Sequence, residues 1–223
     1  MKKTLFAVLL AATGMLGAER FDHIVRNDFF AGFAGDSAAL ARAMQTAEDH
    51  LKQNPKHPEA LVWHGSGLFF QSGQAFRAGD MAKGQELWSR GMAEMDEGIA
   101  LAPDSIATRA PRGGLMITVS RAVPEGMRAE LLKRGLADYV RIFEMQKDTL
   151  AQLPTHPKGE LLLGLADLHD RFGNKEQSLE FVRRVAAEMP ATVYGKRAQQ
   201  WLDTGALPAE QRSCIGCHTA GAK

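Results

Sequence analysis

The sequence contains little cysteine and no excess of basic charge. Only two of its 223 residues are cysteine, and 27 Lys and Arg side chains stand against 26 Asp and Glu. No basic stripe is present to neutralise phosphates, which argues against a nucleic-acid-binding protein. After the N-terminal segment no apolar run approaches the roughly 20 residues that a membrane span needs. We therefore expect a mature chain without a membrane span and without a nucleic-acid partner.

Strand signals are missing as well. The sequence shows no sustained alternation of apolar and polar residues, and β-branched residues are sparse, whereas apolar residues recur at helical spacing almost throughout. Asp36 is the expected N-cap of a helix over 38–51, and His57-Pro58 is expected to open a helix that stops near Gly73. The predicted fold class is all-α, with further helices over 80–101, 125–153, 156–172, 174–190 and 192–202.

The N-terminus has the layout of a secretory signal peptide. Lys2 and Lys3 form a basic region, an apolar run follows over 5–12, and small residues lead to Ala18. This order predicts cleavage after Ala18 and export to the periplasm or beyond; the alternative is a buried helix or an uncleaved anchor. Loss of Lys2 and Lys3 leaves 25 basic against 26 acidic side chains in about 205 residues.

The segment 159–190 carries the spacing of a helical repeat. Ala166 and Ser178 stand where two helices approach closely, Gly173 stands at the turn, and Pro190 ends the second helix. In these positions the segment resembles the tetratricopeptide repeat. The resemblance implies that small side chains bring the two helices together here.

A second segment, 58–103, resembles a stretched copy of the same repeat. The two segments open on similar sequences, Pro55-Lys56-His57-Pro58 and Pro154-Thr155-His156-Pro157. The resemblance implies an α-solenoid of antiparallel helix pairs over 19–204, whose concave face binds a partner protein or peptide segment. An irregular helical bundle is the alternative.

The two cysteines stand together near the C-terminus, in Cys214-Ile215-Gly216-Cys217-His218. Two thiols at this spacing reach the two vinyl groups on one edge of a porphyrin and form thioether bonds, and the following imidazole then lies below the iron. The motif predicts one covalent haem c bound by Cys214 and Cys217, with His218 as the iron ligand.

Three other interpretations of this motif remain. A redox disulfide between Cys214 and Cys217 has the right spacing but lacks the βαβ context of such sites. A structural zinc site needs a fourth ligand, and none is visible nearby in the sequence. The third is a tail that carries no haem.

Residues 207–219 also resemble the haem-binding segment of the c-type cytochromes, including Thr219 after the histidine. That family wraps its haem with a long segment after the motif and takes a distal methionine from it, but only five residues follow His218 here. We therefore expect the distal ligand to come from the helical body, a partner chain or water.

The sequence does not single out that ligand. His64 and His169 are the first candidates, although a histidine on a helix that also carries apolar residues is more often part of the core. His57 and His156 precede prolines where helices are expected to begin, and capping or solvent exposure is expected for both.

Signals for catalysis are absent. The aromatic segment 26–33 is interpreted as a cap on the first helix pair. Pro111-Arg112-Gly113-Gly114 lacks the strand and lysine of a phosphate loop and is interpreted as a turn. No Ser-His-Asp or paired-carboxylate arrangement can be assembled from the spacing, so no catalytic residue is predicted and we do not expect an enzyme.

These observations combine into one hypothesis with three segments: a signal peptide over 1–18, a tetratricopeptide-like domain over 19–204 and a haem-binding tail over 205–223. The hypothesis is an exported mono-haem c-type cytochrome-like protein that transfers electrons and docks a redox partner on its helical body. The alternative is a periplasmic tetratricopeptide scaffold for protein–protein interaction, in which the haem is structural or sensory.

Overall fold

The computed structural model describes residues 20–207, and within this range it contains helices and no strand. The expectation of an all-α protein is confirmed. The elements are α1 (Phe21–Phe33), α2 (Ser37–Gln53), α3 (Pro58–Arg77), α4 (Met81–Leu101), α5 (Ile106–Val119), α6 (Glu125–Gln146), the 3-10 helix η1 (Lys147–Gln152), α7 (Thr155–Arg171), α8 (Lys175–Glu188) and α9 (Val193–Thr204).

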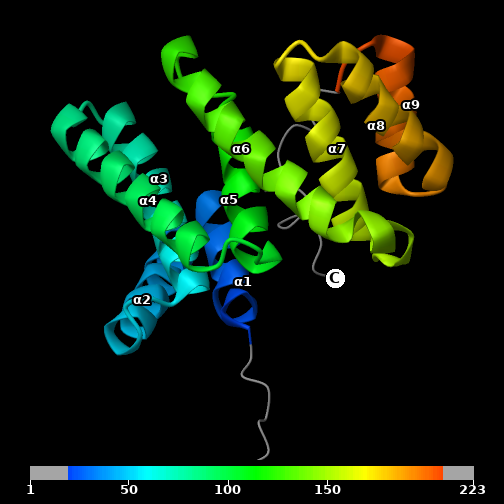
Figure 1. The fold of residues 1–223 in the computed structure, drawn as a ribbon. Helices are drawn as coiled ribbons and strands as arrows, with labels where there is room; N and C mark the ends of the chain where they lie inside the picture. Colours follow the sequence, from blue (N-terminus) through cyan, green and yellow to red (C-terminus); the bar gives the residue numbers. More distant parts are fainter. Residues whose placement is uncertain (1–19, 208–223) are drawn as a thin grey trace, which may run out of the picture.

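Consecutive helices pack in pairs. The pairs are α1 with α2, α3 with α4, α5 with α6 and α7 with α8, and α9 packs on α8. In Figure 1, α2, α3 and α4 lie on the left and α7, α8 and α9 on the right, with α1, α5 and α6 between them. Of the helices described, none combines the length and apolarity that crossing a membrane would require.

Side-chain caps set several helix starts where the sequence predicted them. The Asp36 carboxylate accepts a hydrogen bond from the backbone N–H of Ala39 at 2.9 Å, and Thr192 Oγ1 accepts from Gly195 N at 3.1 Å. Each cap satisfies a backbone donor that the first turn of a helix cannot pair internally.

The expected stop near Gly73 is wrong, because α3 continues to Arg77. Phe76, on the added turn, packs over Gly84 of α4 so closely that a Cβ atom on Gly84 would lie 2.3 Å from the ring. The turn falls instead at Gly79, whose φ of 83° is the left-handed conformation that favours glycine. Packing against α4 therefore extends α3 past the glycine that the repeat spacing indicated.

The expected turn at Pro111-Arg112-Gly113-Gly114 is also wrong, because these residues lie inside α5. Arg112 Nε and Nη2 donate to the fully buried carboxylate of Asp138 on α6, at 2.7 and 2.9 Å. Gly113 packs against the ring of Tyr139, where a Cβ would approach to 2.8 Å. Tertiary contacts hold a helix through residues whose intrinsic preference is for turns.

The predicted helix over 125–153 ends early. Regular α-helix stops at Gln146, and η1 continues to Gln152, which turns Leu150 into the core with 1% of its surface exposed. Leu153 is extended, because the proline at 154 disfavours helical conformation in the residue before it.

Small residues lie where the helices of two pairs approach each other closely. Ala166 is fully buried and Ser178 is 1% exposed, and both lie on the packed pair α7 and α8. Gly173 turns the chain between the two helices with a φ of 81°. In the pair α3 and α4, a Cβ on Gly65 would lie 2.7 Å from the carbonyl oxygen of Gly91. Small residues thus let both pairs pack closely.

Candidate functional site

The residues predicted to bind haem, Cys214, Cys217 and His218, lie outside the described residues, as does the predicted signal peptide. Within 20–207, no group of three or more His, Cys, Asp or Glu side chains is placed to hold a metal ion. The site is therefore built from the concave part of the helical body.

A cavity of about 270 Å³ lies where α1, α3, α5, α6 and α7 converge, and we call it the central cavity. The helices that line it include the first helix of all four pairs, whereas α2, α4 and α8 contribute none of its lining. Its wall is mainly apolar and includes Phe30, Phe33, Trp63, Ile106, Leu115 and Ile142. An apolar cavity with a few polar groups is the usual form of a cofactor or ligand site.

Aromatic rings build one wall of the central cavity. Trp63 of α3 stacks on Phe29 with ring centroids 5.2 Å apart, and Phe30 meets Trp63 edge-on at 5.9 Å. Trp63 is only 4% exposed, and its indole Nε1 has no hydrogen-bond acceptor among the described residues. A buried donor without an acceptor costs free energy, and this nitrogen is too deeply buried to be reached from the cavity, so Trp63 contributes apolar ring surface to the wall.

Charged side chains from the start of α1 line another part of the cavity. The backbone N–H of Asp22 donates to Glu59 at 3.1 Å, and Arg20 Nε lies 3.0 Å from the Asp22 carboxylate. Arg26, on the next turn, is exposed and its Nη1 lies 3.8 Å from the same carboxylate. Asp22 and Arg26 therefore bring one negative and one positive group to this apolar space.

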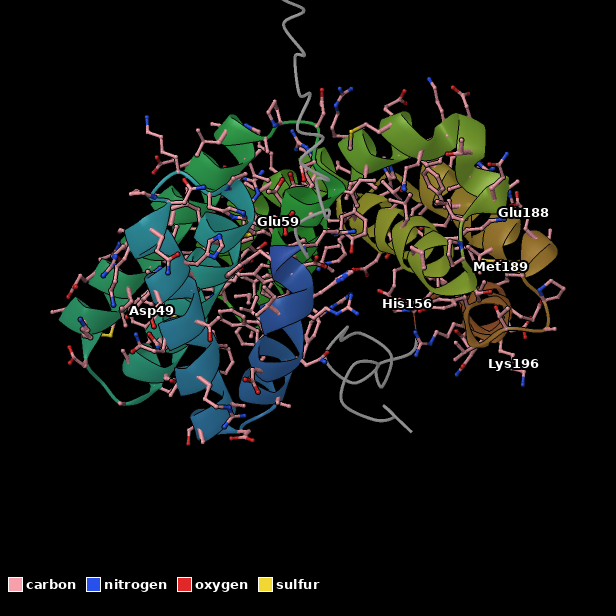
Figure 2. The ribbon with its side chains drawn as sticks, turned by 90° about the horizontal axis from the view of Figure 1, so that it is seen from below. Asp49, Glu59, His156, Glu188, Met189 and Lys196 are labelled. Atoms are coloured by element: carbon pink, nitrogen blue, oxygen red, sulfur yellow. The ribbon has the colours of Figure 1, made fainter. Side chains whose placement is uncertain are left out.

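His156 stands on the opposite side of the central cavity, in the first turn of α7. Figure 2 shows it between the ribbons of α1 and α9. Its Nδ1 lies 2.5 Å from Oη of Tyr194, a buried residue of α9, and Tyr194 Oη donates to Glu160 Oε1 at 3.0 Å. Three side chains thus form a hydrogen-bonded chain from the imidazole to a carboxylate.

This chain determines the tautomer of His156. The phenol of Tyr194 has one proton, which it donates to Glu160. The 2.5 Å contact with His156 therefore requires Nδ1 to be the donor. In the neutral form of this imidazole the proton is on Nδ1, and Nε2 is then the nitrogen with which it could bind a metal ion.

The histidines that sequence reasoning placed first do not line the central cavity. His64 is 2% exposed, with its Nδ1 2.5 Å from Glu94 Oε2 and its Nε2 3.6 Å from Glu48 Oε1. His169 stacks on Phe181 with ring planes 13° apart, and burial lowers the pKa of its imidazole. Both have the packing roles that buried histidines usually have.

His156 is exposed, as the sequence predicted, but the sequence did not predict its contact with α9. The expectation of a cap or a solvent-exposed position describes His57 well, because Nδ1 of His57 accepts a hydrogen bond from Ala60 N at 3.2 Å. The contact of His156 joins it to a residue 38 positions away. Nothing in the local sequence shows that contact.

No protein-family model, curated protein or solved structure gives a significant match to this chain. The chemistry of the central cavity is therefore judged from its own side chains. An apolar, partly aromatic lining, a cation and an oriented imidazole fit an apolar group that has anionic substituents and a metal centre. A haem, with its two propionates, is such a group.

Proposed function

We propose that the protein is an exported mono-haem c-type cytochrome-like protein that transfers single electrons. The observation that carries this proposal is the sequence Cys214-Ile215-Gly216-Cys217-His218, which uses both cysteines of the chain. Cys214 and Cys217 would hold the haem by thioether bonds, and His218 would bind its iron. When bound, the haem supplies an iron that alternates between the ferric and ferrous states.

The N-terminal sequence supports the same proposal. Attachment of haem to cysteine takes place outside the bacterial cytosol, and a basic, apolar and small-residue segment ending at Ala18 is suited to export. We therefore propose a periplasmic or secreted protein whose mature chain starts after Ala18.

The helical body provides the docking surface in this proposal. We infer a tetratricopeptide-like solenoid, because the first helices of four successive pairs line one concave space and small residues hold the pairs together. In such a solenoid the concave face binds a protein or peptide segment, and here that partner is the redox partner.

The first test is the mass and spectrum of the exported protein. The chain is expressed with its signal peptide in a bacterial host that has the c-type attachment machinery, and the periplasmic fraction is purified. The intact mass is expected to equal the chain from Glu19 plus one haem, with a Soret band and a haem-stained gel band. A Cys214→Ala, Cys217→Ala variant is expected to lose all three signals, whereas Ser213→Ala keeps them.

Two outcomes would change the proposal. A wild-type mass equal to the polypeptide alone, without a Soret band, would falsify haem attachment. A loaded protein that does not exchange one electron reversibly in a potentiometric titration would favour the alternative, a periplasmic scaffold whose haem is structural or sensory.

A further inference from the structure

We propose that the haem of the C-terminal tail occupies the central cavity and that Nε2 of His156 is the sixth ligand of its iron. This inference rests on the proposed function, since it requires a haem on Cys214 and Cys217. To the proposed function it adds a binding site for the haem in the helical body and a second iron ligand, His156, which stands 62 positions before His218.

The chemistry of the cavity wall matches the faces and edges of a haem. Phe30, Trp63 and Ile106 offer apolar contact to the macrocycle. The exposed guanidinium of Arg26, which lines the cavity, is a donor suited to a propionate oxygen.

His156 has the hydrogen bonding of a metal-bound histidine. A ligating imidazole usually donates its second ring N–H to a carboxylate or another acceptor, which orients the ring and raises its basicity. Here Nδ1 of His156 donates to Tyr194 Oη, which in turn donates to Glu160. Of the histidines in the described part of the chain, only His156 lines the central cavity.

The tail starts close enough to reach this site. Leu207, the last described residue, packs against the same core cluster as Tyr194 and Trp201 of α9. The twelve residues of α9 rise about 18 Å. Cys214 is seven residues beyond Leu207, and seven extended residues span about 23 Å. The tail can therefore return along α9 to its first turn, where Tyr194 contacts His156.

The decisive experiment is the coordination of the iron in the exported, haem-loaded protein. Wild-type protein is expected to be low-spin and six-coordinate, with a bis-histidine signal in near-infrared magnetic circular dichroism. His156→Ala is expected to convert the ferric iron to high spin and to let the ferrous iron bind one equivalent of carbon monoxide. Added imidazole is expected to restore the low-spin spectrum.

His169→Phe is the matched control, because it removes an imidazole from the same helix and keeps an aromatic ring against Phe181. Its spectrum is expected to match wild type. If haem is attached but His156→Ala remains low-spin, the ligand assignment is overturned while the proposed function stands. If no variant carries haem, the proposed function itself has failed. Far-UV circular dichroism confirms that each variant is folded.

A second variant tests occupancy of the cavity independently of the ligand. Gly114 of α5 lines the central cavity, and among residues 20–207 a Cβ there would have only Tyr139 Oη within 4 Å, at 3.8 Å. Gly114→Leu should therefore fit the haem-free protein and occupy the haem's space in the loaded one. In the haem-loaded protein, Gly114→Leu is expected to lose most of the low-spin signal. In the haem-free Cys214→Ala, Cys217→Ala background, the same substitution is expected to leave the helicity unchanged. An unchanged spectrum would place the haem elsewhere.

Discussion

Two helix starts with nearly the same sequence have different roles in this protein. In Pro55-Lys56-His57-Pro58, α3 begins at Pro58 and His57 is its N-cap, with extended backbone and a side chain that accepts from Ala60 N. In Pro154-Thr155-His156-Pro157, α7 begins at Thr155, so His156 is already helical and does not cap. Relative to the shared His-Pro pair, α7 begins two residues earlier than α3, and its imidazole contacts Tyr194.

The surroundings of the two histidines explain the difference. His57 packs against His50 and Phe21, with ring centroids 4.4 and 5.6 Å away, and these neighbours hold it beside the first turn of α3. At the start of α7, Gly159 takes the place of Ala60, and the Tyr194 ring packs directly on it. The comparison shows that tertiary neighbours decide whether a histidine at a helix start caps the helix or faces a cavity.

The largest effect is expected from Gly159→Ala, which disrupts the start of α7. A Cβ there would lie 2.2 Å from Cγ of Tyr194, so the buried ring must move away from His156. Although alanine favours helix, we expect a loss of about 1–3 kcal/mol in the free energy of unfolding, measured by urea titration. Gly126→Ala is the control, because outside its own helical turn no atom of the described residues lies within 4 Å of the added Cβ. Equal stability of the two variants would contradict this packing.

Removal of the cap should affect only the start of α3. His57→Ala is expected to lower the free energy of unfolding by about 1 kcal/mol, because Ala60 N loses its acceptor. His57→Asn should restore most of this stability, since asparagine is a good N-cap. His156→Ala, compared in the haem-free Cys214→Ala, Cys217→Ala background, should cost less than His57→Ala. Similar losses from both alanine variants would remove the distinction between these helix starts.

Tyr194→Phe should have a smaller effect on stability and a clear effect on the imidazole. The phenol contacts His156, which is exposed, and Glu160, which is half-buried, so water can replace much of the lost hydrogen bonding. We therefore expect the free energy of unfolding to fall by about 0.5 kcal/mol. In the haem-free background, nitrogen NMR should show the Nδ1-protonated tautomer of His156 in the parent and a tautomer mixture in Tyr194→Phe. A mixture already present in the parent would disprove the hydrogen-bonded chain.

The smallest effect is the pH dependence contributed by the start of α3. Burial, followed by repulsion from His50, lowers the pKa of His57, and Glu59 opposes this. Because the folded-state pKa lies below the unfolded value of about 6.5, the unfolded chain binds protons more readily. The contribution of His57 to the free energy of unfolding is therefore fully present above about pH 6.5, and it is lost as the pH falls toward the folded-state pKa.

Thermal unfolding between about pH 7.5 and 5.5 checks this dependence. His57→Asn should flatten the fall in Tm without abolishing it, because burial lowers the pKa of His169 as well. The double variant His57→Asn, His169→Phe should be flatter still. An unchanged slope in the double variant would assign the dependence to other groups.

Local signals predicted most of the helix boundaries. Asp36, Gly173 and Thr192 act as cap, turn and cap at the predicted places, because each works through backbone groups within three or four residues. The failures occur where distant residues override local preference. Phe76 carries α3 past Gly73 by packing on α4, and Asp138 holds Arg112 in a helix through a segment rich in glycine.

The candidate site also has one part that the sequence predicted and one part that it did not. The motif at Cys214, Cys217 and His218 is readable because its chemistry depends on spacing within five consecutive residues. The central cavity was not predicted, since Trp63, Ile106 and His156 converge on it from helices that are far apart in the chain.

The amino-acid order alone settled the helical class of the described residues, most helix ends and the spacing of the proposed haem-attachment motif. These depend on interactions between near neighbours, which a linear pattern records. Which helices pair closely, where α3 and α5 end, and which histidine faces the concave space were decided by packing between remote segments. Packing depends on shape and burial in three dimensions, so the same His-Pro pair caps α3 at one place and lines the cavity at another.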